Sequence, residues 1–345
     1  MSLPIRPPFP PMEAEPVPEI PSGFEWQYEP KWDGFRCLAF RDGARVDLQS
    51  KAMQPLARYF PEIVSALSAL RPQLFVVDGE IVIPVEGGLS FDDLLQRIHP
   101  AESRVNRLAR EHPAMLIVFD LLVDETGRFI AGQPLASRRE KLEEFAGKFF
   151  PEGGSVRLSP ATRSLAEARG WLRTMGGSLD GLIAKRADLP YMPGERGEAM
   201  RKIKFRRTAD CVVGGFRYEQ KQRRVGSLLL GLYDEEGLLH HVGFTSGIKT
   251  IDRGPLTLKL ERLIEPPGFT GRAPGGPSRW NAGRSTEWQP LRPELVVEVE
   301  YDHFTGGRFR HGTRLVRFRP DKPPRHCTLA QVERESRSPL AILQA

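Results

Sequence analysis

A lysine and a carboxylate stand two residues apart in front of a glycine at residues 31–34, Lys-Trp-Asp-Gly. A lysine amine acts as a nucleophile only after losing its proton, so burial or neighbouring cations must lower its pKa from about 10.4. Asp-Gly is also a common hairpin turn, and a lysine beside it is often only a surface residue. The residues that follow in the chain favour chemistry, and we interpret Lys31 as a nucleophile whose pKa is lowered by nearby cations.

Further charged and aromatic residues recur at the ends of apolar runs short enough to be strands, so their side chains would gather at sheet edges. Because side chains repeat every second residue along a strand, Lys202 and Lys204 would share one face. Two ammonium groups on one face repel each other unless an anion lies between them. The groups in chain order are Asp78-Gly79-Glu80, Phe119-Asp120, Asp180-Gly181 with Lys185, Lys202-Ile203-Lys204, and Arg319-Pro320-Asp321-Lys322.

The elements that must position Lys31 can be predicted from the local pattern. Residues 35–40 and 44–49 are strand-like runs around Asp42-Gly43, which is a strong hairpin signal. Lys31 would therefore lie just before the first strand of the hairpin. Ser50-Lys51 would follow its second strand.

The next elements supply the other candidate residues. Residues 74–83 predict a second hairpin-like pair, broken at Asp78-Gly79. Apolar residues at helical spacing predict a helix within 55–70. Ser-x-x-Glu patterns predict helix starts at Ser137 and Ser164.

A chain of 345 residues predicts two domains. We expect the first at residues 1–207, with an extended arm at 1–23, and the second at 208–345. Residues 266–290, rich in Gly, Pro and Arg, predict a long exposed loop within the second domain. Short strands predict a small barrel there, at residues 211–216, 225–233, 238–244, 295–301 and 313–318.

Charge is unevenly distributed between the two parts of the chain. Residues 1–206 hold 28 Lys plus Arg and 28 Asp plus Glu, whereas residues 207–345 hold 22 and 16. A basic second domain suits a polyanionic partner, although excess arginine also merely solubilises a surface.

Composition indicates the cellular compartment of the protein. The three cysteines are odd in number and far apart, which argues for a reducing cytosol and against a zinc site or a disulfide framework. No apolar run approaches the 18 residues that a membrane span requires, and we expect neither a signal peptide nor an anchor.

The serial order of these motifs resembles the covalent nucleotidyltransferases, the superfamily of ATP-dependent DNA ligases, RNA ligases and mRNA capping enzymes. Within it, the chain is most similar to compact bacterial ATP-dependent DNA ligases, from about Pro11 to about Cys327. The resemblance implies an α+β fold, with a nucleotidyltransferase (ATP-grasp-like adenylation) domain followed by an OB-fold β-barrel that binds DNA. It also implies ATP as substrate, Mg²⁺ or Mn²⁺ as cofactor, and nicked double-stranded DNA as the partner.

The resemblance further implies a role for each matching residue. Lys31 would form a lysyl-AMP adduct, pass the AMP to a DNA 5′-phosphate, and let the 3′-hydroxyl displace it. Glu80 and Asp180 would bind the metal, Glu80 also the ribose, while Ser50 and Lys51 would contact DNA. Residues implied to bind ATP are Glu29, Arg36, Glu80, Phe119, Lys185, Arg196, Lys202 and Lys204, with Lys202 and Lys204 at the α-phosphate, and those implied to close over it are Arg319, Asp321 and Lys322.

Two positions depart from the pattern of the family. Asp180 stands where many members have Glu, and Lys51 where many have Arg, which replaces a two-pronged phosphate grip with a point charge. The closure over ATP must reverse for DNA to enter, so we expect a hinge near residues 206–210.

Alternatives remain open at this point. An RNA ligase or a GTP-dependent capping guanylyltransferase would share Lys31, Glu80 and the barrel. A non-catalytic, basic OB-fold protein would bind DNA with surface lysines only. By resemblance, we expect a stand-alone monomer in the bacterial cytoplasm, at the nucleoid while acting, that uses a repair polymerase or end-joining proteins in trans in DNA repair, recombination or replication.

Overall fold

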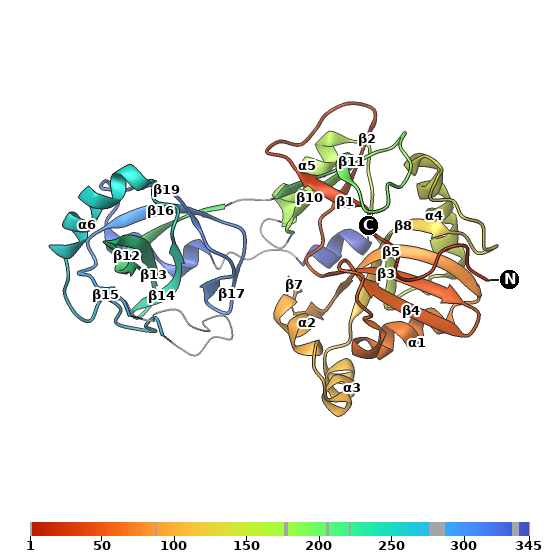
Figure 1. Cartoon of the computed structure of the whole chain (residues 1–345), viewed down its shortest axis with the longest axis horizontal. Helices are drawn as coiled ribbons and strands as arrows, with labels where there is room; N and C mark the ends of the chain where they lie inside the picture. The colour runs from red at the N-terminus through yellow and green to blue at the C-terminus, as the bar shows by residue number, and fades with distance from the viewer. Residues whose placement is uncertain are drawn as a thin grey trace. The chain divides into compact units, whose positions relative to one another are not determined.

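The computed structural model describes residues 2–86, 88–175, 179–204, 207–220, 222–275, 287–332 and 338–344. The chain divides into two compact units, residues 1–205 with 336–345, and residues 206–335 (Figure 1). This division differs from the expected one in two respects. The boundary lies two residues earlier, and the last ten residues cluster with the first unit.

The first unit is built on two sheets. The five-stranded sheet has the order β4-β3-β5-β8-β9, formed by Arg45–Ser50, Phe35–Asp42, Leu74–Val82, Met115–Val123 and Val156–Leu158. The four-stranded sheet has the order β1-β11-β10-β2, formed by Glu13–Pro16, Arg196–Lys204, Gly181–Arg186 and Trp26–Pro30. A small pair, β6 (Pro84–Val85) and β7 (Gly88–Leu89), follows β5.

The alternation of buried side chains explains how the two sheets stack. On β3, Leu38 and Phe40 belong to a core cluster that also contains Ala199 and Met200 of β11, so these faces pack against each other. Cys37 and Ala39 point the opposite way, into a cluster with the helices of the five-stranded sheet. The outer face of the four-stranded sheet packs against α5. The unit is therefore layered, with helices outside and two sheets inside.

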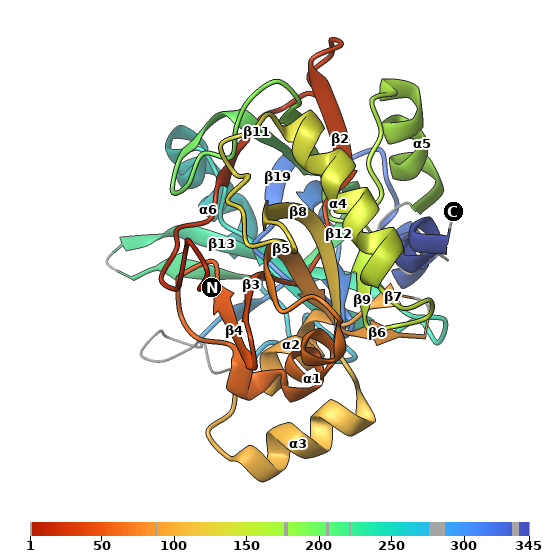
Figure 2. The ribbon, with the colours of Figure 1, turned by 90° about the vertical axis from the view of Figure 1, so that its right-hand side faces the viewer.

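The helices cover these outer faces. Figure 2 shows α4 lying along β8, where Leu142 and Phe145 enter the core. The helices are α1 (Pro61–Ala69), α2 (Phe91–Arg97), α3 (Glu102–Glu111), α4 (Leu135–Phe149) and α5 (Leu165–Met175). None of the helices in the described ranges is both long and apolar enough to cross a membrane.

The two predicted helix starts, at Ser137 and Ser164, had different outcomes. Ser164 is confirmed as a cap, since its hydroxyl accepts a hydrogen bond from the Glu167 amide at 3.3 Å just before α5. The predicted start at Ser137 is wrong. Helix α4 begins at Leu135 after Pro134, which fixes its own φ near the helical value and needs no donor at that position.

The predicted second hairpin at residues 74–83 is also wrong, because β5 is one continuous strand. Gly79 lies inside it rather than in a turn. A Cβ at Gly79 would lie 2.6 Å from the carbonyl oxygen of Ile117 on β8. The glycine is therefore needed for the close approach of two strands.

The first hairpin is confirmed by β3 and β4, which pair antiparallel around residues 43–44. The N-terminal arm lies on this unit as expected. It adds β1 as a parallel edge strand on β11 and buries Leu3 and Met12. At the other terminus, Pro339–Gln344 form a short 3-10 helix whose Ile342 packs against Trp32.

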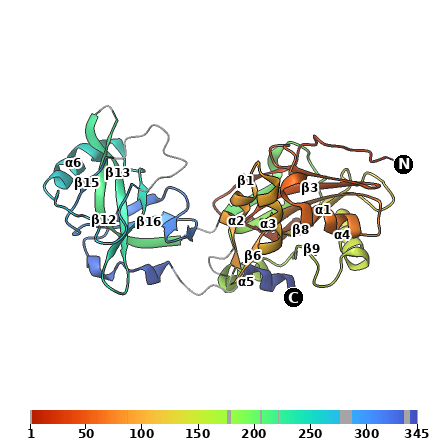
Figure 3. The ribbon, with the colours of Figure 1, turned by 90° about the horizontal axis from the view of Figure 1, so that it is seen from below.

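The second unit is rich in strands, as expected. Its main sheet has the order β14-β13-β12-β16-β19, and a bridge between Thr245 and Thr313 joins its two edges. Helix α6 (Arg253–Glu261) packs on β13 (Figure 3). The strands are β12 (Arg207–Glu219), β13 (Gln222–Tyr233), β14 (Leu239–Thr245), β15 (Gln289–Pro290), β16 (Val296–Tyr301), β17 (Phe304–Thr305), β18 (Arg308–Phe309) and β19 (Arg314–Phe318). The predicted hinge residue 206 and part of the predicted loop, residues 276–286, lie outside the described residues.

A buried ion pair joins β8 to α4 and yields a stability prediction. The Arg138 guanidinium donates to both oxygens of Asp120 at 2.8 and 2.9 Å, and both side chains are about 1% exposed. Burial alone would raise the pKa of Asp120, but Arg138 outweighs it and holds that pKa below its ordinary value. The pair therefore stabilises the fold fully above about pH 4 and progressively less as the pH falls through the folded-state pKa.

We expect Asp120→Asn to lower the free energy of unfolding by about 3 to 5 kcal/mol at pH 7, since it leaves the Arg138 charge buried without a partner. Urea unfolding followed by circular dichroism measures this. Asp47→Asn is the control, because Asp47 pairs with the exposed Arg45, and it should change stability by less than about 0.5 kcal/mol. Equal effects of the two substitutions would contradict the prediction.

Candidate active site

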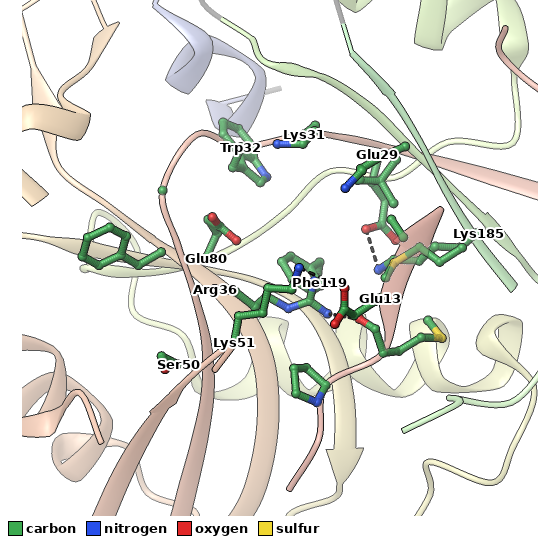
Figure 4. Close-up of a pocket in the computed structure, with 18 of the residues that line it drawn as sticks. Glu13, Glu29, Lys31, Trp32, Arg36, Ser50, Lys51, Glu80, Phe119 and Lys185 are labelled. Atoms are coloured by element: carbon green, nitrogen blue, oxygen red, sulfur yellow. Dashed lines mark hydrogen bonds and ion pairs between the residues drawn. The ribbon is translucent and has the colours of Figure 1, made fainter. Parts of the chain in front are cut away.

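A pocket of about 500 Å³ opens in the first unit and is lined by both sheets and by the N-terminal arm. Figure 4 shows its lining side chains converging from the different strands. The arm contributes residues 11–14. The predicted residues that line the pocket are Glu29, Lys31, Arg36, Ser50, Lys51, Glu80, Phe119, Lys185 and Lys202.

Lys31 is held at the end of β2 by the start of β10. The Lys31 amide donates to the carbonyl of Gly181 at 3.0 Å, and the Asp180 amide donates to the carbonyl of Lys31 at 3.3 Å. Gly181 has φ +142°, and a Cβ there would lie 1.9 Å from the Ile203 carbonyl oxygen. Only glycine fits this position, which explains the Asp-Gly sequence in front of the strand.

The Lys31 ammonium group forms a close ion pair with the Asp180 carboxylate. Burial lowers the pKa of Lys31, but the carboxylates of Asp180, Glu80 and Asp33 outweigh it, so that the pKa lies above its ordinary value. The expectation that neighbouring cations lower this pKa is therefore wrong. The reason is that carboxylates rather than ammonium groups dominate the surroundings of the amine.

Glu80 shows the opposite effect of burial on an acid. Desolvation raises the pKa of Glu80 to about 7, although Lys31 and Arg36 act to lower it. The side chain reaches the pocket from β5, at the register position opposite Arg36 on β3. Further positive charge in the pocket would lower this pKa and stabilise the ionised form of Glu80.

Phe119 places an aromatic ring in the pocket wall. Its side chain is 8% exposed, and the Lys185 Nζ and the Arg36 Cζ lie 4.5 and 4.6 Å from the ring centroid. Lys185 is in turn paired with Glu29 at 2.7 Å, and both side chains are buried. These contacts fix the orientation of the ring and of the Glu29 carboxylate.

Arg36 uses much of its guanidinium on a partner that was not among the candidate residues. Its Nη2 donates to Asp78 at 2.6 Å, and Tyr191 donates its hydroxyl to the same carboxylate at 2.7 Å. Asp78 is fully buried. The buried Asp78 carboxylate thus fixes the orientation of the Arg36 guanidinium, and Arg36 also lines the pocket.

The two lysines of β11 differ in their exposure and in whether they line the pocket. Lys202 lines the pocket and lies opposite Ile183 of β10, whereas Lys204 is exposed and outside the lining. Burial lowers the pKa of Lys202, as do the nearby charges of Lys51, Lys31, Arg196 and Lys204. Arg196 contacts Glu13 of the arm instead of lining the pocket.

Arg319, Asp321 and Lys322 belong to the second unit and form contacts within it. The Arg319 guanidinium donates to Asp321 at 2.8 Å and to Asp210 at 2.9 Å. The Lys322 ammonium group lies 3.4 Å from the same Asp210 carboxylate. Their predicted role toward ATP stays a prediction.

Two features of the site had no usable signal in the sequence. Glu13 reaches the pocket from an arm whose composition indicates only an extended segment. Trp32, next to Lys31, donates to the Ser159 hydroxyl at 2.9 Å and is covered by Ile342 from the far end of the chain. Local periodicity predicts neither feature. Glu13 lies outside any motif, and the contacts of Trp32 join residues more than 100 positions apart.

Family models match both parts of the chain. Residues 11–204 match the ATP dependent DNA ligase domain, and residues 221–322 match the ATP dependent DNA ligase C terminal region. Both descriptions are of DNA ligases, so they do not favour the RNA ligase, the capping enzyme or the non-catalytic alternative. ATP is accordingly the nucleotide of the matched family.

Curated relatives agree with the family models. DNA ligase C2 of Mycolicibacterium smegmatis is 44% identical over 96% of each chain, and DNA ligase C of Mycobacterium tuberculosis is 44% identical over 97% of this chain and 96% of its own. The multifunctional non-homologous end joining protein LigD of Mycobacterium bovis is 29% identical over 87% of this chain and 37% of its own.

Solved structures support the expected fold. The Pmar-Lig structure has a TM-score of 0.55 at 17% identity and covers 85% of this chain and 63% of its own. A Lig E DNA ligase has a TM-score of 0.52 at 17% identity and covers 86% and 93%. The expected α+β class, a nucleotidyltransferase domain followed by an OB-fold barrel, is confirmed. With both parts of its length matched and relatives 44% identical over nearly all of it, the chain belongs to the ATP-dependent DNA ligase family.

Proposed function

We propose that this DNA ligase seals nicks in duplex DNA with Lys31 as its nucleophile. The observation that carries the proposal is the position of Lys31 in the pocket between the sheets, next to Asp180 and across from cationic and aromatic side chains. A nucleophile held among groups that bind a nucleotide matches what covalent catalysis requires.

In the first step, Lys31 Nζ attacks the α-phosphorus of ATP. The Lys31 ammonium group first loses one proton to water, so that the neutral amine attacks. A P–N bond then forms, the P–O bond to pyrophosphate breaks with pyrophosphate as the leaving group, and Nζ releases a second proton to water. Lys202 lines the pocket with Lys31 and would offset the charge that develops on the α-phosphate. The AMP then passes to the DNA 5′-phosphate, and the 3′-hydroxyl displaces it.

The nucleotide would be held by the pocket wall. The Phe119 ring would stack on adenine, with its orientation set by Lys185 and Arg36. Glu29, Arg36 and Lys185 would contact the base, ribose and phosphates. The predicted roles of Ser50, Lys51, Arg196, Arg319, Asp321 and Lys322 toward ATP or DNA are part of the same proposal, and Lys204, which is outside the pocket lining, is given a smaller role at the α-phosphate than Lys202.

Glu80 and Asp180 are the carboxylates that would hold Mg²⁺, or Mn²⁺ in its place. Hard cations prefer carboxylate oxygens, and the pKa of Glu80, raised by burial to about 7, indicates an acid that gains from a nearby cation. The ion would supply charge neutralisation at the phosphates. The same positive charge would oppose the carboxylates that now raise the pKa of Lys31.

The proposed setting is a monomer in the bacterial cytoplasm, at the nucleoid while acting. A repair polymerase or end-joining proteins would act with it in trans. Its similarity to a part of a multifunctional non-homologous end joining protein supports the end-joining setting. The excess of basic over acidic residues in the second part of the chain supports a DNA partner.

The nucleotide and the nicked substrate test the function directly. With α-labelled nucleotides, we expect the protein to take label from ATP and not from GTP. On nicked duplexes, we expect it to seal DNA strands. Label taken only from GTP would remove the ligase assignment, and sealing of RNA strands only would replace the proposed substrate.

The presence of Lys202 in the pocket lining, and the absence of Lys204 from it, yields a paired prediction. We expect Lys202→Ala to slow lysyl-AMP formation by about 100-fold to 1,000-fold, the usual cost of one group that stabilises transition-state charge. Lys204→Ala should slow it by less than about tenfold, since Lys204 lies outside the pocket lining. Single-turnover labelling at saturating ATP measures both rates. A greater loss in Lys204→Ala would show that this geometry does not govern the first step.

A further inference from the structure

Glu13 occupies a fixed place on the N-terminal arm, at the edge of the pocket. Strand β1 pairs in parallel with β11, with Glu13 opposite Arg196. The Glu13 amide donates to the Glu195 carbonyl at 2.8 Å, and the preceding Met12 is buried with its amide donating to the Tyr191 hydroxyl at 3.0 Å. The backbone is therefore anchored at Met12 and Glu13, so a change of position would involve the Glu13 side chain.

The Glu13 carboxylate lies between two cations from different elements. Its Oε2 accepts from Arg196 Nε at 3.2 Å and lies 3.0 Å from the Lys51 Nζ. Hydrogen bonds from Arg196 and Lys51 hold the pKa of Glu13 below its ordinary value, so the group is ionised at neutral pH. Figure 4 shows Glu13 and Lys51 together at the pocket wall.

The positive charge around this carboxylate exceeds what it balances. Lys202 also lines the pocket, and the charges of Lys51 and Arg196 contribute to lowering its pKa. Three cations thus act on one region that contains a single carboxylate from the arm. A phosphate group carries up to two negative charges and several acceptor oxygens, which matches this surplus better than a carboxylate does.

We propose that the Glu13 carboxylate holds the place of a substrate phosphate in the Lys51–Arg196 site and must turn away when that phosphate binds. Glu13 then sets how strongly the ligase favours a phosphorylated ligand. The inference rests on the proposed function and deepens it. The shared ligand chemistry is a phosphate group, whose source is either the 5′ end of the nicked strand or the β- and γ-phosphates of ATP.

The displacement that this requires is physically easy. The side chains of Glu13, Lys51 and Arg196 are 28%, 54% and 53% exposed, so their ion pairs are partly solvated. Partly exposed ion pairs are weak, whereas an arginine grips a phosphate through two parallel hydrogen bonds. A phosphate therefore displaces the carboxylate from the site. The carboxylate lowers the affinity of the site for phosphate only modestly.

The chain offers a matched control on the same strand. Glu15 forms an ion pair with Arg201 across the same two strands, but a register shift after Ala14 separates it from Glu13, and neither Glu15 nor Arg201 lines the pocket. Glu13→Gln and Glu15→Gln remove the same charge from the same arm. General electrostatic attraction of DNA therefore changes alike in both variants.

The first arm of the test uses nicked duplexes with a 5′-phosphate or a 5′-hydroxyl, without ATP and in the presence of a chelator. We expect Glu13→Gln to raise the ratio of the two affinities by about twofold to fivefold, the range that partly exposed ion pairs support. Glu15→Gln should leave the ratio at the wild-type value. A merely structural role for Glu13 would alter both affinities and not their ratio.

The second arm measures the KM for ATP and inhibition by pyrophosphate in lysyl-AMP formation. A lower KM with stronger inhibition in Glu13→Gln alone, at an unchanged 5′-end ratio, assigns the displaced phosphate to the nucleotide. Unchanged or weaker binding in both arms overturns the inference. A wild-type chain that forms no lysyl-AMP overturns the proposed function instead, so the two failures are distinguishable.

Discussion

The close ion pair between Lys31 and Asp180 is the contact on which the rest of the site depends. It joins the end of β2 to the start of β10, and backbone hydrogen bonds between the same two segments support it. Burial lowers the pKa of this amine, but the surrounding carboxylates outweigh burial and raise it above its ordinary value. Positive charge in the pocket would offset those carboxylates and favour the neutral amine that the proposed role of Lys31 requires.

The architecture explains why so many charges can share one small space. On β10 and β11 alternate residues line the pocket, which are Ile183 and Lys185 on one strand and Met200 and Lys202 on the other. Charged side chains of the pocket form ion pairs with buried carboxylates. Arg36 pairs with Asp78, and Lys185 pairs with Glu29. Buried polar groups that are paired in this way keep a fixed orientation, which favours catalysis by positioning and charge rather than by movement of the residues themselves.

Much of this site could be predicted from the sequence because its residues follow short apolar runs. That rule located Glu80, Phe119 and Lys202, while the Lys-Trp-Asp-Gly spacing indicated Lys31, and all four line one pocket. It failed where the reason for a residue is tertiary. Gly79 has the sequence of a turn, but it lies in a strand because β8 approaches too closely for a Cβ. The direction of the Lys31 pKa also depended on distances that no spacing encodes.

Long-range contacts account for the other differences. The return of residues 338–344 to the first unit and the entry of Glu13 into the pocket each depend on a terminal segment whose own pattern indicates no element. The barrel was predictable in outline from its regular short strands. The pairing of Arg319 and Lys322 with Asp210 was not, because it joins residues more than 100 positions apart.

The central claim is that the Lys31 amine carries the nucleotide, and peptide mapping by mass spectrometry tests it most directly. After incubation with ATP and Mg²⁺, the account predicts one adenylate, located on the peptide that contains Lys31 and absent from Lys31→Ala. The exposed Lys148, substituted in the same way, should leave the adduct intact. An adenylate on any other peptide, or one that persists in Lys31→Ala, would contradict the account.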